Sequence, residues 1–220
     1  MKATSPGPTS IGSPPSGVIV ATVGREEAEE GLLTCLANGA DRAIRIDAQQ
    51  LSDPDPLAVA TALAALARRE QPDLVLCGVQ STDGAHAVTG IALAGLLELA
   101  HVAVVKAIEL DGGQITVERE LEGGAVEVLR VATPALLTVQ TGINEPRYAT
   151  LRAIKQARNK PLQTLALSEL ELDAATLDGV RGARVRALAE RDASAGATMI
   201  DGSPQEIATR ILEIIGESNG

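Results

Sequence analysis

The sequence predicts an α/β fold: a doubly wound, mostly parallel sheet with an antiparallel hairpin and a C-terminal arm. Between Val18 and Ala107, short apolar runs alternate with amphipathic segments, as in parallel strands joined by helices. Two later runs, 114–120 and 127–130, alternate polar and apolar residues around a Glu-Gly-Gly turn, which indicates a hairpin with one face in water. From residue 162 the chain is more polar and irregular, which is typical of an arm outside the main core.

The first half of the chain supplies most elements of the predicted sheet. Gly24 closes the first apolar run, and Gly39 ends the first helix because glycine accepts the backbone conformation found at helix C-termini. Such an alternation forms an open, Rossmann-like sheet whose ligands bind at the carboxyl ends of the strands. The expected strands are 18–23, 43–46, 74–77 and 101–107, and the expected helices are 26–38, 56–69 and 90–97.

The second half adds a buried strand at 134–139 and a final helix at 204–215. Ser203 precedes that helix, Pro204 stands in its first turn and Glu206 follows three residues after the serine, which is the pattern of a helix N-terminus.

We expect three parts along the chain. Residues 1–17 hold four Pro, three Gly and four Ser, and cannot bury enough apolar surface to offset their ordering entropy, so they form a disordered leader. Residues 18–161 form a nucleotide-binding-type α/β domain. Residues 162–220 form a C-terminal arm and helix that we expect to pack on a partner subunit.

Composition excludes several classes of function. The net charge of -10 repels nucleic acid and anionic lipid, and no run of about 18 apolar residues exists to span a bilayer. We therefore expect neither a nucleic-acid partner nor membrane insertion. The N-terminus has no apolar stretch of the signal-peptide kind, which favours a cytoplasmic protein.

Aromatic and cysteine residues are few. Tyr148 is the one aromatic residue in the chain, so the core must be aliphatic. Cys35 and Cys77 have no CxxC spacing and no nearby histidine, so the sequence indicates neither a disulfide framework nor a zinc site. We expect both to be small buried residues.

The segment from Gly78 to Thr89 joins a buried strand to a helix N-terminus, where backbone amides and the helix dipole favour an anion such as a phosphate. Its hydroxyl groups are further donors, and Gln80 and Asp83 are suited to a ribose or a base. A polar loop without any ligand remains the alternative. His86 and His101 have no partner at triad or metal spacing, so we assign them no catalytic role.

The segment 147–160 is strongly basic. It holds five Lys and Arg residues and no acidic residue, with Leu151 among them. An apolar anchor with cations around it is suited to docking on an acidic partner surface. The alternative is a solvated helix face in which Leu151 belongs to the core.

Several of these segments resemble the β subunit of electron transfer flavoprotein. The resemblance covers roughly residues 18 to 162 and is strongest in the hairpin from Val117 to Gly124 and in the run 134–138. The segment 144–151 is similar to the opening of the family's partner-recognition loop, and 73–80 to its nucleotide-binding strand and loop.

The resemblance implies a set of roles. It implies a heterodimer with an α subunit that holds most of an FAD, acyl-CoA or other flavin dehydrogenases as electron donors, and AMP or a second FAD in this subunit. It places the nucleotide site at Val23, Gly78, Val79, Gln80, Ser81, Thr82, Asp83, Gly84, Ala85, His86 and Thr89. It makes Leu151 the docking anchor with Arg147, Lys155 and Arg158 around it, and places Glu120 against the mobile flavin domain.

The sequence also departs from the family pattern. We expect the family's usual N-terminal strand and loop to be lacking, since the Pro/Ser-rich leader stands in the place of that region. Gly84, Ala85 and Ala87 replace an acidic run and an asparagine, so fewer side-chain contacts to a nucleotide are expected. We therefore keep two alternatives: an AMP- or ATP-binding sensor of the same fold, and a truncated structural subunit without nucleotide.

Overall fold

The structure is a computed structural model that describes residues 17–51, 55–111, 114–180, 182, 187, 189 and 199–218. The chain divides into two compact units, one up to Arg184 and one from Val185 onward. Apart from Gly17, the predicted leader lies outside the described residues. None of the helices in the described ranges is long and apolar enough to cross a membrane.

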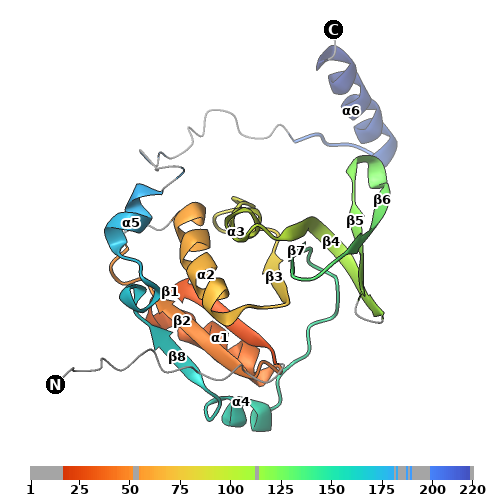
Figure 1. The fold of residues 1–220 in the computed structure, drawn as a ribbon. Helices are drawn as coiled ribbons and strands as arrows, with labels where there is room; N and C mark the ends of the chain where they lie inside the picture. Colours follow the sequence, from red (N-terminus) through yellow and green to blue (C-terminus); the bar gives the residue numbers. More distant parts are fainter. Residues whose placement is uncertain are drawn as a thin grey trace, which may run out of the picture. The chain divides into compact units, whose positions relative to one another are not determined.

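Three parallel strands form the first sheet (Figure 1), in the order β1-β2-β8. The strands are β1 (Ile19–Gly24), β2 (Arg42–Asp47) and β8 (Leu162–Leu165). Helices cover both of its faces, which is the doubly wound arrangement. One face holds α1 (Glu29–Ala37), reached through the turn η1 (Glu26–Ala28), and the other holds α2 (Pro56–Glu70), η3 (Leu167–Leu170) and α5 (Ala174–Gly179).

Five strands form the second sheet, in the order β3-β7-β4-β5-β6. β3 and β7 are parallel, β4 begins parallel to β7, and β4, β5 and β6 run antiparallel to one another. Figure 1 shows the β5–β6 hairpin extending from the rest of this sheet. Their bounds are β3 (Leu74–Gly78), β4 (Ala100–Asp111), β5 (Gln114–Glu120), β6 (Val126–Val131) and β7 (Ala135–Val139), with the turn η2 (Glu122–Gly124) between β5 and β6.

Helix α2 packs against both sheets through alternating alanines. Ala58 and Ala62 belong to the core cluster over β2 and β8, whereas Ala60 and Ala64 belong to the cluster formed with α3 (Thr89–Leu97) and β7. All four are buried. Small side chains on two sides of the helix allow it to lie between two packed layers.

β1 and β3 are each paired along one edge. β1 pairs with β2, and β3 pairs with β7, so the described strands form two sheets and not one. Leu76 in β3 is 56% exposed, although the equally apolar β7 is almost wholly buried. An apolar strand with an open edge is a site for pairing with another chain.

The α/β fold class predicted from the sequence is confirmed, and every predicted strand and helix is present with bounds shifted by a few residues. β8 was not predicted; Leu162–Leu165 pairs with β2, and Leu165 is fully buried in its core cluster. The expectation that Cys35 is buried was wrong, because it lies on the solvent side of α1 while Leu32 and Leu36 form the buried stripe. Cys77 is partly buried.

The described part of the C-terminal unit consists mainly of α6 (Pro204–Ser218). The predicted N-terminus is confirmed: the Glu206 carboxylate accepts hydrogen bonds from the Ser203 amide and hydroxyl, both at 2.7 Å. Ile207, Ile211, Ile214 and Ile215 recur at helical spacing and form one apolar stripe. The last three of these side chains are exposed.

Candidate functional site

The β3–α3 loop, residues 79–88, stands at the carboxyl end of β3, where the sequence places a ligand. All of its side chains except that of Val79 are exposed. Gly84 donates from its amide to the Asp83 carboxylate at 2.7 Å and to the Ser81 hydroxyl at 3.2 Å. Hydrogen bonds from the Ser81 side chain and the Gly84 amide lower the pKa of Asp83. Asp83 therefore holds the loop in shape as an anion.

Helix α3 begins with open backbone donors. Val88 at the N-cap makes no side-chain capping bond, and within the described structure the amides of Thr89, Gly90 and Ile91 donate to no protein acceptor. Such amides, together with the positive end of the helix dipole, suit a phosphate group. The nine residues of α3 give this end about two and a half turns of aligned peptide dipoles behind it.

Gly90 fixes where this helix N-terminus lies. A Cβ atom at Gly90 would stand 2.6 Å from Cγ2 of Thr138 in β7 and 3.2 Å from Cβ of Cys77 in β3. Because Gly90 has no side chain, α3 can pack closely against β3 and β7. The sequence drew attention to the glycines of the loop but not to this packing role.

A hollow of about 340 Å³ lies at the opposite end of β3, beside Pro72, Asp73 and Pro134. It contains none of the predicted nucleotide-binding residues. The β3–α3 loop is exposed instead, so a ligand bound there would contact backbone amides and exposed side chains at the surface.

Arg45 fills the carboxyl end of the first sheet with polar contacts. Its guanidinium donates to the Glu29 carboxylate at 2.9 Å, to the Asp47 carboxylate at 3.2 Å and to the Gly24 carbonyl at 3.2 Å. Arg45 is almost fully buried, and its charge is compensated by both acids. Val23 packs into the α2 core, in a different sheet from β3, whose carboxyl end carries the β3–α3 loop.

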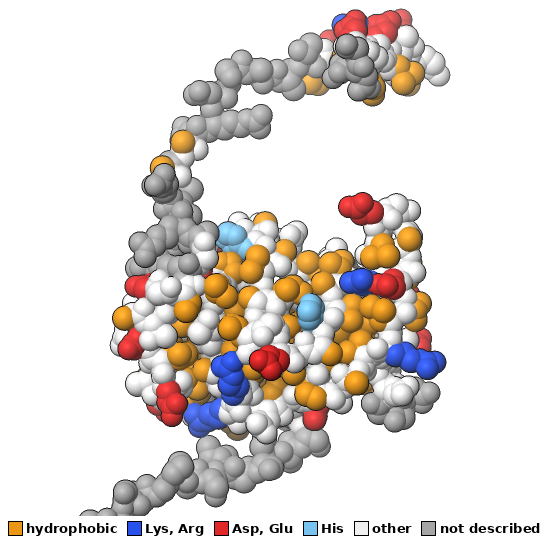
Figure 2. Space-filling model, turned by 45° about the horizontal axis from the view of Figure 1, so that its top comes forward, with side chains coloured by type: hydrophobic (Ala, Val, Ile, Leu, Met, Phe, Trp, Pro, Cys, Tyr) orange, Lys and Arg blue, Asp and Glu red, His pale blue; other side chains and the backbone are white. Residues whose placement is uncertain are grey.

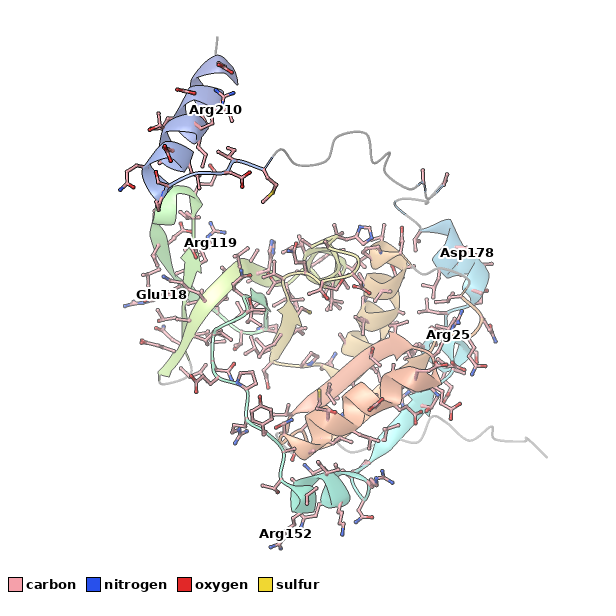
Figure 3. All side chains as sticks on the ribbon, turned by 180° about the vertical axis from the view of Figure 1, so that it is seen from behind. Arg25, Glu118, Arg119, Arg152, Asp178 and Arg210 are labelled. Atoms are coloured by element: carbon pink, nitrogen blue, oxygen red, sulfur yellow. The ribbon has the colours of Figure 1, made fainter. Side chains whose placement is uncertain are left out.

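The α4 segment, residues 147–160, contains the short helix α4 (Leu151–Ala157). Leu151 is 81% exposed and Tyr148 is fully exposed, so the alternative that Leu151 belongs to the core is wrong. The side chains of Arg152, Lys155 and Arg158 are also exposed. Figure 3 shows Arg152 directed away from the body of this unit.

Glu120 is the last residue of β5, at the tip of the β5–β6 hairpin, and is exposed. Its register partner is Val126, and the neighbouring pair is an ion pair between Arg119 and Glu127 at 2.5 Å. Figure 3 shows Glu118 and Arg119 on opposite sides of the hairpin, as strand alternation requires. Glu120 has no ion-pair partner within the described part of the chain.

No group of His, Cys, Asp and Glu suited to a metal ion occurs among the described residues. His86 lies in the exposed β3–α3 loop, and His101 lies on β4 and is also exposed.

A comparison with family models and a comparison with individual proteins identify the same family. The electron transfer flavoprotein domain family matches residues 12–170. The electron transfer flavoprotein subunit beta of Methylophilus methylotrophus is 40% identical over 206 residues, which cover 92% of this chain and 78% of that protein. The chain belongs to the electron transfer flavoprotein β-subunit family.

Other relatives in the family cover less of their own length. The subunit beta of Bacillus subtilis is 38% identical over 159 residues, and that of Bos taurus is 39% identical over 158 residues. Each match covers 71% of this chain and 62% of the relative. The chain thus spans somewhat less than two thirds of the length of these two relatives.

Proposed function

We propose that this chain is a β-like subunit of an electron transfer flavoprotein, an electron carrier without its own catalytic residues. In this role it binds an α subunit that holds most of an FAD and docks acyl-CoA or other flavin dehydrogenases through the α4 segment. The observation that carries the proposal is the exposed Leu151 surrounded by three exposed cations in a member of this family.

The docking chemistry follows from these side chains. Burying an exposed leucine in a partner's pocket contributes about 1.5 to 3 kcal/mol of association free energy. Arg152, Lys155 and Arg158 steer an acidic partner surface toward that anchor, an effect that weakens as salt rises. The α4 segment is positively charged, whereas the rest of the chain carries a net negative charge.

We infer that the phosphate of the nucleotide, AMP or a second FAD, binds at the N-terminus of α3. The open amides of Thr89, Gly90 and Ile91 would hold it, with the Thr89 hydroxyl as a further donor. Asp83 contributes by shaping the loop, since its carboxylate is bonded to the Gly84 amide. Bound FAD supplies the redox chemistry, because the flavin accepts and donates one or two electrons.

Two other surfaces complete the proposal. Glu120, at the exposed hairpin tip, makes an ionic contact with the α subunit's mobile flavin domain. Of the predicted C-terminal arm, α6 packs on the α subunit with its apolar stripe as the contact face, whereas residues 162–179 belong to the core of the first unit.

The test begins with the absorbance spectrum of the chain purified alone and with its α subunit, followed by mass analysis of nucleotide released on denaturation. A yellow heterodimer that releases AMP or FAD beyond one FAD per pair supports the full proposal. One FAD and nothing more indicates a structural subunit without nucleotide. A colourless monomer that binds AMP or ATP indicates the sensor.

Leu151→Ala tests docking separately from cofactor content. We expect dehydrogenase-dependent flavin reduction to slow about tenfold or more, with FAD content unchanged, because an anchor is removed and no cofactor contact is. Leu110→Ala is the matched control, since Leu110 is 74% exposed on β4, outside the α4 segment. Equal loss of reduction rate and flavin content in Leu151→Ala would contradict the division of roles.

A further inference from the structure

The five cations of the α4 segment do not play the same part in the structure. Arg152, Lys155 and Arg158 make no hydrogen bond or ion pair within the described residues, whereas Arg147 and Lys160, one on each side of α4, both donate to backbone carbonyls at the end of α1. We propose that Arg147 and Lys160 are positioning residues that clamp the α4 segment onto the C-terminal end of α1. The effect of these two residues on docking rests on the proposed function, whereas their contacts with α1 are independent of it.

The contacts converge on one short stretch of backbone. The ammonium group of Lys160 donates to the carbonyls of Leu36 at 2.9 Å and Ala40 at 2.6 Å. The guanidinium of Arg147 donates to the carbonyl of Asn38 at 3.1 Å. The carbonyls of residues 36, 38 and 40 thus all accept hydrogen bonds from charged side chains. Arg147 is 109 positions from Asn38 in the chain, and Lys160 is 124 positions from Leu36.

The end of a helix is a favourable place for such cations. α1 ends at Ala37, and the last carbonyls of a helix lack intrahelical donors and carry partial negative charge. Gly39 has a φ of +127°, which glycine adopts readily, and the carbonyls of Asn38 and Ala40 on either side of it are acceptors for Arg147 and Lys160. The α1 sequence has no Lys or Arg in its last turn, so this role falls to residues from α4's flanks.

Few side chains of α4 are buried against α1, so polar contacts from the residues that flank it contribute to holding the segment in place. α4 has seven residues, too few for a stable isolated helix, and Ala157 is its one buried residue. Ala157 joins the cluster of Leu32, Leu36, Ala40 and Ala43. One buried methyl group is a small anchor for a helix that exposes Leu151 and, in part, Ile154.

The clamp changes the interpretation of Arg147. The sequence grouped it with Lys155 and Arg158 as a docking residue, but its guanidinium is bonded to the Asn38 carbonyl. Arg147 and Lys160 face α1, while Leu151 and the three remaining cations face solvent. The segment therefore has an inner side that fixes it and an outer side that is free for a partner.

Hydrogen–deuterium exchange of the full chain tests the clamp without any partner. In Lys160→Met and in Arg147→Met, which keep the apolar stems and remove the donors, we expect amides of 151–157 to exchange about tenfold or more faster. Lys160→Arg should restore slow exchange, because it keeps a charged donor. Arg158→Met is the matched control and should leave exchange in α4 unchanged. Exchange in the β5–β6 hairpin should remain as in the wild type.

Two outcomes would overturn the clamp: unchanged exchange in α4 in both variants, or equally faster exchange in the hairpin, which would mean general destabilisation.

Kinetics with the α subunit and a dehydrogenase then separate the clamp from the proposed function. Lys160→Met should raise the KM for the electron transfer flavoprotein about three- to tenfold with kcat unchanged, since a disordered docking segment binds less often in the right conformation. If exchange rises in Lys160→Met but neither this variant nor Leu151→Ala alters the kinetics, the clamp stands and the docking function fails. If Leu151→Ala alters the kinetics while α4 exchange is unchanged in the clamp variants, docking stands and the clamp fails.

Discussion

At the scale of single residues, Gly90 shows most directly how packing places the candidate phosphate site. Gly90→Ala would put a methyl group 2.6 Å from Thr138 and 3.2 Å from Cys77, so α3 must move away from β3 and β7. We expect a loss of about 1 to 3 kcal/mol in the free energy of unfolding, measured by urea denaturation. Gly95→Ala is the control: it lies on the exposed side of the same helix with open space around it, and alanine there should be neutral or stabilise by up to about 1 kcal/mol.

Asp83 gives a prediction for pH. The Ser81 side chain and the Gly84 amide hydrogen-bond its carboxylate and lower its pKa in the folded chain. Because the folded pKa lies below the unfolded one, the charged loop form is fully favoured above the unfolded pKa of about 4 and is lost as pH falls through the folded value. NMR titration of the carboxyl carbon should give a midpoint below that of an unperturbed aspartate, and Ser81→Ala should move it upward. A midpoint that does not respond to Ser81→Ala would show that the loop does not hold this conformation in solution.

At the scale of elements, α2 is the helix that the core depends on from two sides. Ala60 and Ala62 are both fully buried, one toward α3 and β7 and the other toward β2 and β8. Ala60→Leu and Ala62→Leu should each lower the free energy of unfolding by about 1 to 3 kcal/mol, because added methyl groups have no space on either side. Arg69→Ala, on the exposed end of the helix, should change it by less than about 0.5 kcal/mol. Tolerance of leucine at position 62 alone would mean that the packing of α2 on the first sheet is loose.

At the scale of the whole molecule, exposed apolar side chains and unpaired strand edges favour self-association. Figure 2 shows hydrophobic side chains spread over one face of the main unit. Leu76, 56% exposed on a strand with one unpaired edge, is part of this chain's exposed apolar set. We expect the isolated chain to self-associate at high concentration through such surface.

Leu76→Lys tests that expectation. Light scattering of the chain without its partner should fall, while circular dichroism stays that of the folded protein, since the new charge points into solvent. Leu137→Lys, on the neighbouring and fully buried β7, should instead unfold the chain. Undiminished scattering in a folded Leu76→Lys variant would show that self-association uses another surface.

The sequence by itself determined most of the elements and their types, with β8 as an exception. Apolar runs bounded by glycine and the Ser203–Glu206 cap of α6 are local signals, because local backbone preferences decide where a strand or helix starts and stops. The sequence also located the β3–α3 loop at a strand's carboxyl end and the basic segment around Leu151, because both follow from order and charge along the chain.

Only the tertiary structure decided how those residues are used. The short run Leu162–Leu165 is a strand because β2 offers it a parallel edge, and Cys35 is exposed because α1 turns its other side to the core. Arg147 and Lys160 bind the end of α1, while Arg152, Lys155 and Arg158 make no hydrogen bond or ion pair within the described residues. These roles depend on contacts between residues up to 124 positions apart, which no pattern within a window of the sequence contains.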